Sequence, residues 1–181
     1  MQYFSNVLFA VRFLAAAAAA SASYGLFTAD FVSIVSILII FSEAISLVSA
    51  IISRKIGEPA GGRALRPYVD SIGRIAEFLA LSNLSLAWAA VPLIMAILEI
   101  IIVYCGVALA GTGASLETGI PAKAKWLAHF AAAVALAVYP LALSAEHLTI
   151  ISAAGSVIVI LFSSVAALHA VVKAFSIAGR R

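Results

Sequence analysis

The sequence predicts an all-α membrane protein, a single transmembrane domain over residues 1–181 that is built as a bundle of six helices. Mean hydropathy is +1.17 and only 10% of the residues are charged, a balance that soluble domains of this length do not have. The apolar runs also reach the roughly 20 residues that a helix needs to cross a bilayer. Six such runs leave room for short loops only.

Glycine, proline and polar clusters divide the chain into these runs. The predicted spans are 6–24, 29–53, 69–91, 92–111, 124–144 and 148–173. The breaks between them are Gly25 to Asp30, the polar stretch 54–67, Ser82 to Ser85 with Pro92, the segment GTGASLETGIP that ends at Pro121, and Ser144 to Thr149. We expect the first span to be retained rather than cleaved as a signal peptide, because MQYFSN lacks a basic residue and Arg12 interrupts the apolar run.

The basic residues predict the orientation of these spans. With the amino terminus inside, one side of the membrane receives Arg54, Lys55, Arg63, Arg66, Lys123, Lys125, Lys173, Arg180 and Arg181. The other side receives Asp30, Glu146 and His147, and no lysine or arginine. Both termini are therefore expected in the cytoplasm of a bacterial or archaeal cell, with the protein in its plasma or inner membrane. Because topology accounts for the basic residues, no nucleic acid partner is expected.

Ionisable residues also occur inside the predicted spans, where they are costly and usually face a bundle interior or a wet cavity. They are Arg12, Glu43, Asp70, Arg74, Glu77, Glu99, His129 and His169. Most fall in the expected cytoplasmic half, which predicts a polar cavity open to the cytoplasm between the second and third spans. The simpler alternative is a set of local salt bridges with no ligand.

A serine stripe on the second span opens a longer pattern that runs from Ser46 to Glu77. In register, this stretch resembles the signature of the CDP-alcohol phosphotransferase (CDP-alcohol phosphatidyltransferase) family, D-x-x-D-G-x-x-A-R, a spacer, and G-x-x-x-D-x-x-x-D. Ser46 and Ser49 stand at the first two acids, Asp70 at the third and Arg74 at the fourth. The signature arginine is retained as Arg54, and Arg66 stands at the second glycine.

Three further fragments place the resemblance closest to the phosphatidylglycerophosphate synthase branch. They retain Asn6 and Arg12 at the start of the first span, Glu99 in the fourth, and Lys123 and Lys125 around the start of the fifth. The resemblance implies a six-span fold of phospholipid biosynthesis type. It also implies candidate nucleotide- or phosphate-binding residues: Arg54, Ser46, Ser49, Arg66, Lys123 and Lys125.

Family enzymes hold divalent metal ions through these aspartates and use the last one as a base. Here Asp70 and Arg74 together supply about zero charge where four aspartates supply about −4. We therefore expect no metal and no other cofactor, with Mg²⁺ or Mn²⁺ needed only if the protein is active. Arg74 shares a helix face with Asp70 and Glu77, and we expect an internal ion pair among them that also draws on Glu43.

Three functions follow from these residues. The first is a non-catalytic relative that binds membrane lipids, CDP-diacylglycerol among the candidates, and forms a homodimer or a heteromer with another membrane protein. The second is an active but atypical phosphatidyltransferase, with Asp70, Glu77 and Glu43 as its acids, that releases CMP from CDP-diacylglycerol with an acceptor such as glycerol 3-phosphate. The third is a small transporter or scaffold in which the acids and His129 mark an ion path.

Overall fold

The computed structural model describes residues 2–24, 29–56, 60–110, 119–142 and 147–178, with the backbone alone at 2–6, 29–30, 53–56, 60–67, 110 and 142. These residues form six α-helices and no strand, which confirms the all-α prediction for the described part of the chain. The helices are α1 (Gln2–Ala22), α2 (Ala29–Ile56), α3 (Ala60–Asn83), α4 (Val91–Ala110), α5 (Ile120–Ala142) and α6 (Leu148–Ala178).

Four of the helices are long and apolar enough to cross a membrane, within the described residues. Their candidate spans are Phe31–Ile52, Val91–Leu109, Ile120–Leu141 and Leu148–Ala178. The apolar stretch of α1, Val7–Ala22, is shorter. Helix α3 is not a candidate because charged residues recur along it. The four apolar helices indicate an integral membrane protein.

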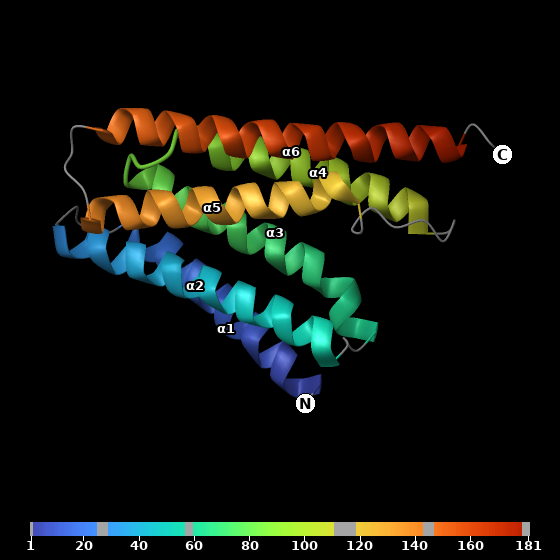
Figure 1. The fold of residues 1–181 in the computed structure, drawn as a ribbon, viewed down its shortest axis with the longest axis horizontal. Coiled ribbons are helices and arrows are strands. Elements are labelled where there is room, and N and C mark those ends of the chain that lie inside the picture. The colour runs from blue at the N-terminus through green and yellow to red at the C-terminus, as the bar shows by residue number, and fades with distance from the viewer. Residues whose placement is uncertain (1, 25–28, 57–59, 111–118, 143–146, 179–181) are drawn as a thin grey trace.

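The six helices alternate in direction, so the first and last described residues lie toward the same end of the bundle (Figure 1). Helix α1 packs along α2, and α6 packs against both α4 and α5. Helix α3 lies between these groups and contacts α1, α4 and α5, while α2 also contacts α5. The least apolar helix is therefore the one surrounded by other helices, which protects its charged face from lipid.

The third helix begins earlier and ends earlier than the predicted third span, 69–91. Helix α3 begins at Ala60, inside the stretch 54–67 that glycine and proline were expected to keep non-helical. That stretch contains Arg63-Ala64-Leu65-Arg66, a run of strong helix formers, and isolated breakers are a weak signal against such a run.

The predicted break at Ser82 to Ser85 is real, and it ends α3 at Asn83. Ser85 has a φ of 58°, and the amide of Leu86 bonds the carbonyl of Leu81 at 2.8 Å. Helix α4 then begins at Val91. Three other predicted breaks, around Gly25, GTGASLETGIP and Ser144, lie largely outside the described residues.

The apolar core occupies the half of the bundle that contains the α3–α4 connection. Its larger buried members are Val35, Ile39, Phe78, Leu81, Met95, Leu136 and Val159. Helix α6 approaches α5 closely there, since a β-carbon on Gly155 would lie 3.0 Å from a methyl carbon of Leu136. The outer faces are apolar as well, as on α4, where Leu93, Ile100 and Tyr104 are exposed. An apolar surface of this extent is typical of contact with lipid.

Candidate functional site

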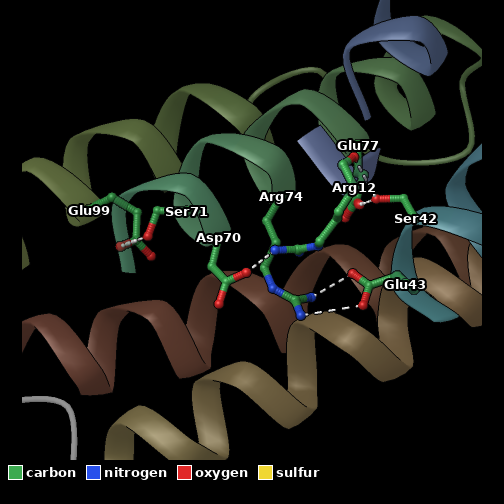
Figure 2. A network of polar contacts seen from close by, with 8 residues as sticks. All are labelled: Arg12, Ser42, Glu43, Asp70, Ser71, Arg74, Glu77 and Glu99. Atoms are coloured by element: carbon green, nitrogen blue, oxygen red, sulfur yellow. Dashed lines mark hydrogen bonds and ion pairs between the residues drawn. The ribbon is translucent and has the colours of Figure 1, made fainter. Parts of the chain in front are cut away.

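The second half of the bundle contains buried charges, of which the central pair joins α2 to α3. Arg74 on α3 donates from Nη1 to Glu43 Oε1 at 2.7 Å and from Nη2 to Oε2 at 3.3 Å (Figure 2). Both side chains are almost wholly excluded from the surface, 4% exposed for Arg74 and 0% for Glu43. The planar guanidinium and the carboxylate thus form a two-pronged, charge-assisted contact. This geometry fixes the rotation of α3 relative to α2.

A second ion pair joins α1 to α3 beside the first. The Nη1 of Arg12 donates to Asp70 Oδ1. Arg12 is 1% exposed although it stands in an alanine-rich helix, and Asp70 is 21% exposed. Gly73 lies against the same guanidinium, where a β-carbon would make ordinary contact at 3.8 Å from Cζ. Asp70, which the resemblance places at the third signature acid, is therefore engaged by a basic residue of the first helix.

Glu77, one helical turn beyond Arg74, completes the cluster. It is fully buried, and its Oε1 lies 2.5 Å from Ser42 Oγ on α2 in a hydrogen bond. The Glu43 carboxylate is close enough to act on it electrostatically. The predicted network paired Arg74 with Asp70 and Glu77 and also drew on Glu43. In the structure the hydrogen bonds of Arg74 go to Glu43, while Arg12 bonds Asp70 and Ser42 bonds Glu77.

The serines at the positions of the first two signature acids point into the bundle. Ser46 is 4% exposed and Ser49 is 1% exposed, and Ser49 Oγ lacks a hydrogen-bond partner among the described residues. Because these hydroxyls are neutral, the charged groups of this region are the two ion pairs and Glu77. Arg54 and Arg66 have side chains outside the described residues.

Helix α5 closes the cluster from the opposite side. The ring of Trp126 lies 5.6 Å from Cζ of Arg74, within the range of a cation–π contact. The preceding residue, Lys125, contacts Glu99 Oε1 of α4 through Nζ at 2.5 Å, and Glu99 Oε2 accepts from Ser71 of α3 at 2.8 Å. Lys123 is exposed. Of the two candidate phosphate-binding lysines, Lys125 is thus held in an internal pair.

Several buried polar atoms of the cluster have no hydrogen-bond partner among the described residues. They are Arg12 Nε and Nη2, Arg74 Nε, Ser49 Oγ and Glu77 Oε2. Unsatisfied buried polar atoms are costly and are usually bonded to ordered water. These atoms therefore mark where water would enter the cluster.

The acids of the cluster do not fit a divalent cation. Asp70 and Glu43 each hold a guanidinium, and a cation within a few ångströms of these two positive groups would be repelled. In the part of the chain that the structure describes, no group of three or more His, Cys, Asp and Glu residues could hold a metal ion. A cavity of about 30 Å³ lies elsewhere, between α4, α5 and α6, and has room for one or two water molecules.

The sequence pattern alone missed the partners Arg12, Ser42 and Ser71. Arg12 was visible as a charge inside an apolar run, which signals a buried partner but not which one. Ser42 and Ser71 carried a weaker signal, since serines in membrane helices commonly serve in packing.

The described geometry defines a class: a helical integral membrane protein whose core is ionic in one half and apolar in the other. No family model, no curated protein and no solved structure matches the chain.

Proposed function

We propose that this protein is a six-span membrane protein of the CDP-alcohol phosphotransferase type that does not catalyse phosphatidyl transfer and acts instead as a binding partner within the membrane. The observation that carries this proposal is the buried two-pronged pair of Arg74 and Glu43. By the resemblance, Arg74 stands where the family has its catalytic base. A permanently charged guanidinium cannot accept a proton from an alcohol.

The neighbouring contacts support the same proposal. Asp70 is the only signature acid retained, and it pairs with Arg12. Ser46 and Ser49 offer neutral hydroxyls, which are poor ligands for Mg²⁺ compared with carboxylates. A metal-bound diphosphate needs a surplus of negative ligands, and here each of the two guanidiniums already has a carboxylate beside it. The charges set how the helices fit together and do not present a metal site.

The proposed topology puts all six helices across the membrane with both termini in the cytoplasm. The alternating helix directions and the clustering of basic residues at the loops on one side support it (Figure 1). Helices α1 and α3 are shorter or less apolar than the other four, but both are packed against other helices, which allows charged residues on their inner faces. The ion pairs then lie in the cytoplasmic half, and a second copy or another membrane protein would dock on the lipid-facing surface.

A purified-protein assay tests the absence of catalysis. The protein is placed in lipid nanodiscs with CDP-diacylglycerol, glycerol 3-phosphate, and Mg²⁺ or Mn²⁺, and CMP release is measured. We expect no release above that of empty nanodiscs, whereas an active synthase of this family in the same preparation serves as the positive control. CMP release that disappears in Asp70→Ala would contradict the proposal and favour the atypical phosphatidyltransferase.

A second experiment tests the proposed binding partner. Pull-down of a membrane partner from detergent extracts, compared with self-association by native mass measurement, distinguishes a heteromer from a homodimer.

A further inference from the structure

The buried cluster formed by α1, α2 and α3 contains more acids than bases. Its bases are the guanidiniums of Arg12 and Arg74, whose respective partners are Asp70 and Glu43. Glu77 is the fifth charged residue. It shares a hydrogen bond with the neutral hydroxyl of Ser42 and lies beside the carboxyl of Glu43, which is itself an acid. With every acid ionised, the cluster would therefore hold one uncompensated negative charge at a site that is 0% exposed. Such a charge is strongly disfavoured in a low-dielectric interior.

The remaining ionisable groups around Glu77 do not supply the missing positive charge. Those on the helices packed around it are Arg12 of α1, Glu43 of α2, Asp70 and Arg74 of α3, Glu99 of α4, and Lys125 and His129 of α5. Glu99 and Lys125 neutralise each other. His129 shares a hydrogen bond with Ser163 through Nε2 at 2.7 Å, and its buried Nδ1 has no partner among the described residues. A cationic imidazole needs acceptors for both ring N–H groups, so the neutral ring fits this position better.

The hydrogen bonds of Ser42 favour one position for an extra proton. Its Oγ contacts Glu77 Oε1 and also lies 3.5 Å from the backbone carbonyl of Arg12. A hydroxyl has one proton, so it cannot donate to both acceptors at once. If Glu77 carries a proton on Oε1, the carboxyl donates to Ser42 and Ser42 donates to the carbonyl. Both contacts are then satisfied by one continuous chain of donors.

We propose that Glu77 is a proton-binding site, occupied at neutral pH, that makes the charged cluster of the bundle electrically neutral. The reaction is the simple loss of the carboxyl proton to water, which leaves a carboxylate. Asp70 lies two helical turns from Glu77 and is 21% exposed, so the Asp70 end is the more accessible end of the cluster. This inference uses the charges and contacts alone and holds whether or not the protein is catalytic.

Infrared spectroscopy of the purified protein in nanodiscs tests the proposal directly. A protonated carboxyl has a carbonyl stretch separate from that of a carboxylate, and it shifts on exchange into deuterium oxide. At neutral pH, we expect the wild-type protein to show this band and Glu77→Gln to lose it. The matched control is Glu99→Gln, which removes another buried glutamate that has a lysine partner, and it should keep the band.

Each other outcome overturns the proposal. If the wild-type protein shows no protonated carboxyl band at neutral pH, the cluster is fully ionised, whatever the behaviour of the variants. If the band persists in Glu77→Gln and is lost in Glu43→Gln, the proton belongs to the other glutamate.

The dependence of unfolding on pH gives a second readout for the same site. A proton held by the folded protein but lost by the unfolded chain stabilises the fold less as pH rises. We therefore expect the melting temperature of the wild-type protein in detergent to fall as pH rises from mildly acidic to neutral, where the unfolded chain has already lost this proton, and that of Glu77→Gln to fall less. Equal slopes for the two proteins would contradict a proton on Glu77. Neither readout depends on CMP release, so failure here and failure of the proposed function are separate results.

Discussion

The two halves of this bundle are held together in different ways. In the half with the α3–α4 connection, the interior consists of apolar side chains such as Ile39, Phe78, Leu81 and Leu136. In the other half, α3 is joined to α1 by Arg12 and Asp70 and to α2 by Arg74 and Glu43. Apolar packing tolerates small rotations of a helix, whereas a two-pronged ion pair does not. The apolar half therefore accounts for tight packing, and the ionic half for the register of α3.

The two halves also differ in whether they add stability to the fold or specificity to the helix packing. A buried ion pair contributes little net stability, because desolvating two charges offsets most of their attraction. Breaking it is nevertheless expensive, since the remaining charge has no partner. Removing a methyl group from the apolar half costs in proportion to the cavity left behind. Substitutions in the two halves should thus differ in whether a second substitution can restore what the first one lost.

Arg74→Leu is expected to have the largest effect, a loss of about 3–5 kcal/mol in the free energy of unfolding, because Glu43 is left buried and unpaired. The double variant Arg74→Leu with Glu43→Leu should recover most of that loss. Unfolding of the protein in mixed detergent micelles by increasing sodium dodecyl sulfate, followed by the fluorescence of its two tryptophans, Trp88 and Trp126, measures both. A double variant no more stable than Arg74→Leu would show that the pair itself supplies net stability. That result would contradict the view that the ionic half sets helix register without adding stability.

Leu136→Ala should produce the next largest effect, about 3 kcal/mol, within the range for buried leucines. Leu136 is 1% exposed, and its side chain lies against Gly155 of α6. The matched control is Leu161→Ala on α6, where the side chain is 55% exposed on the outer face. The same unfolding titration should show a much smaller change for the control. Similar losses for both leucines would mean that the outer face of α6 is covered, which points to an oligomer.

The sequence located the charges of the ionic half but not all of their partners. Helical spacing places Asp70, Arg74 and Glu77 on one face of α3, which the cluster confirms. It cannot tell which neighbouring helix that face meets, because this depends on how every helix is packed. Arg12, 58 residues from Asp70, is therefore found only in the folded structure.

Helix ends were the less predictable part of the fold. The break at Ser82 to Ser85 was recognised from local composition, but the apolar run beyond it led the predicted span to continue to 91. The turn at Ser85 is held by a residue far along the chain, since the amide of Trp88 donates to Ser156 Oγ of α6 at 3.0 Å. A contact 68 residues away in the chain has no local signal in the sequence. The all-helical class, by contrast, rests on hydropathy summed over whole segments and was predictable.

Lys125→Met should have the smallest effect of the three substitutions. It tests an intermediate case, because the Lys125–Glu99 pair is charged like the pairs of the ionic half but less deeply buried than Arg74 and Glu43. The side chains are 16% and 9% exposed, so water screens the remaining charge when one partner is removed. We expect a loss of about 1 kcal/mol in the same titration, well below that of Arg74→Leu. The control is Lys123→Met, two residues away on α5 and exposed, which should leave stability unchanged within about 0.5 kcal/mol. A loss for Lys125→Met as large as that for Arg74→Leu would show that the ionic half extends through α4 and α5 as one dry network. A negligible loss would confine the tightly held charges to α1, α2 and α3, where Glu77 lies.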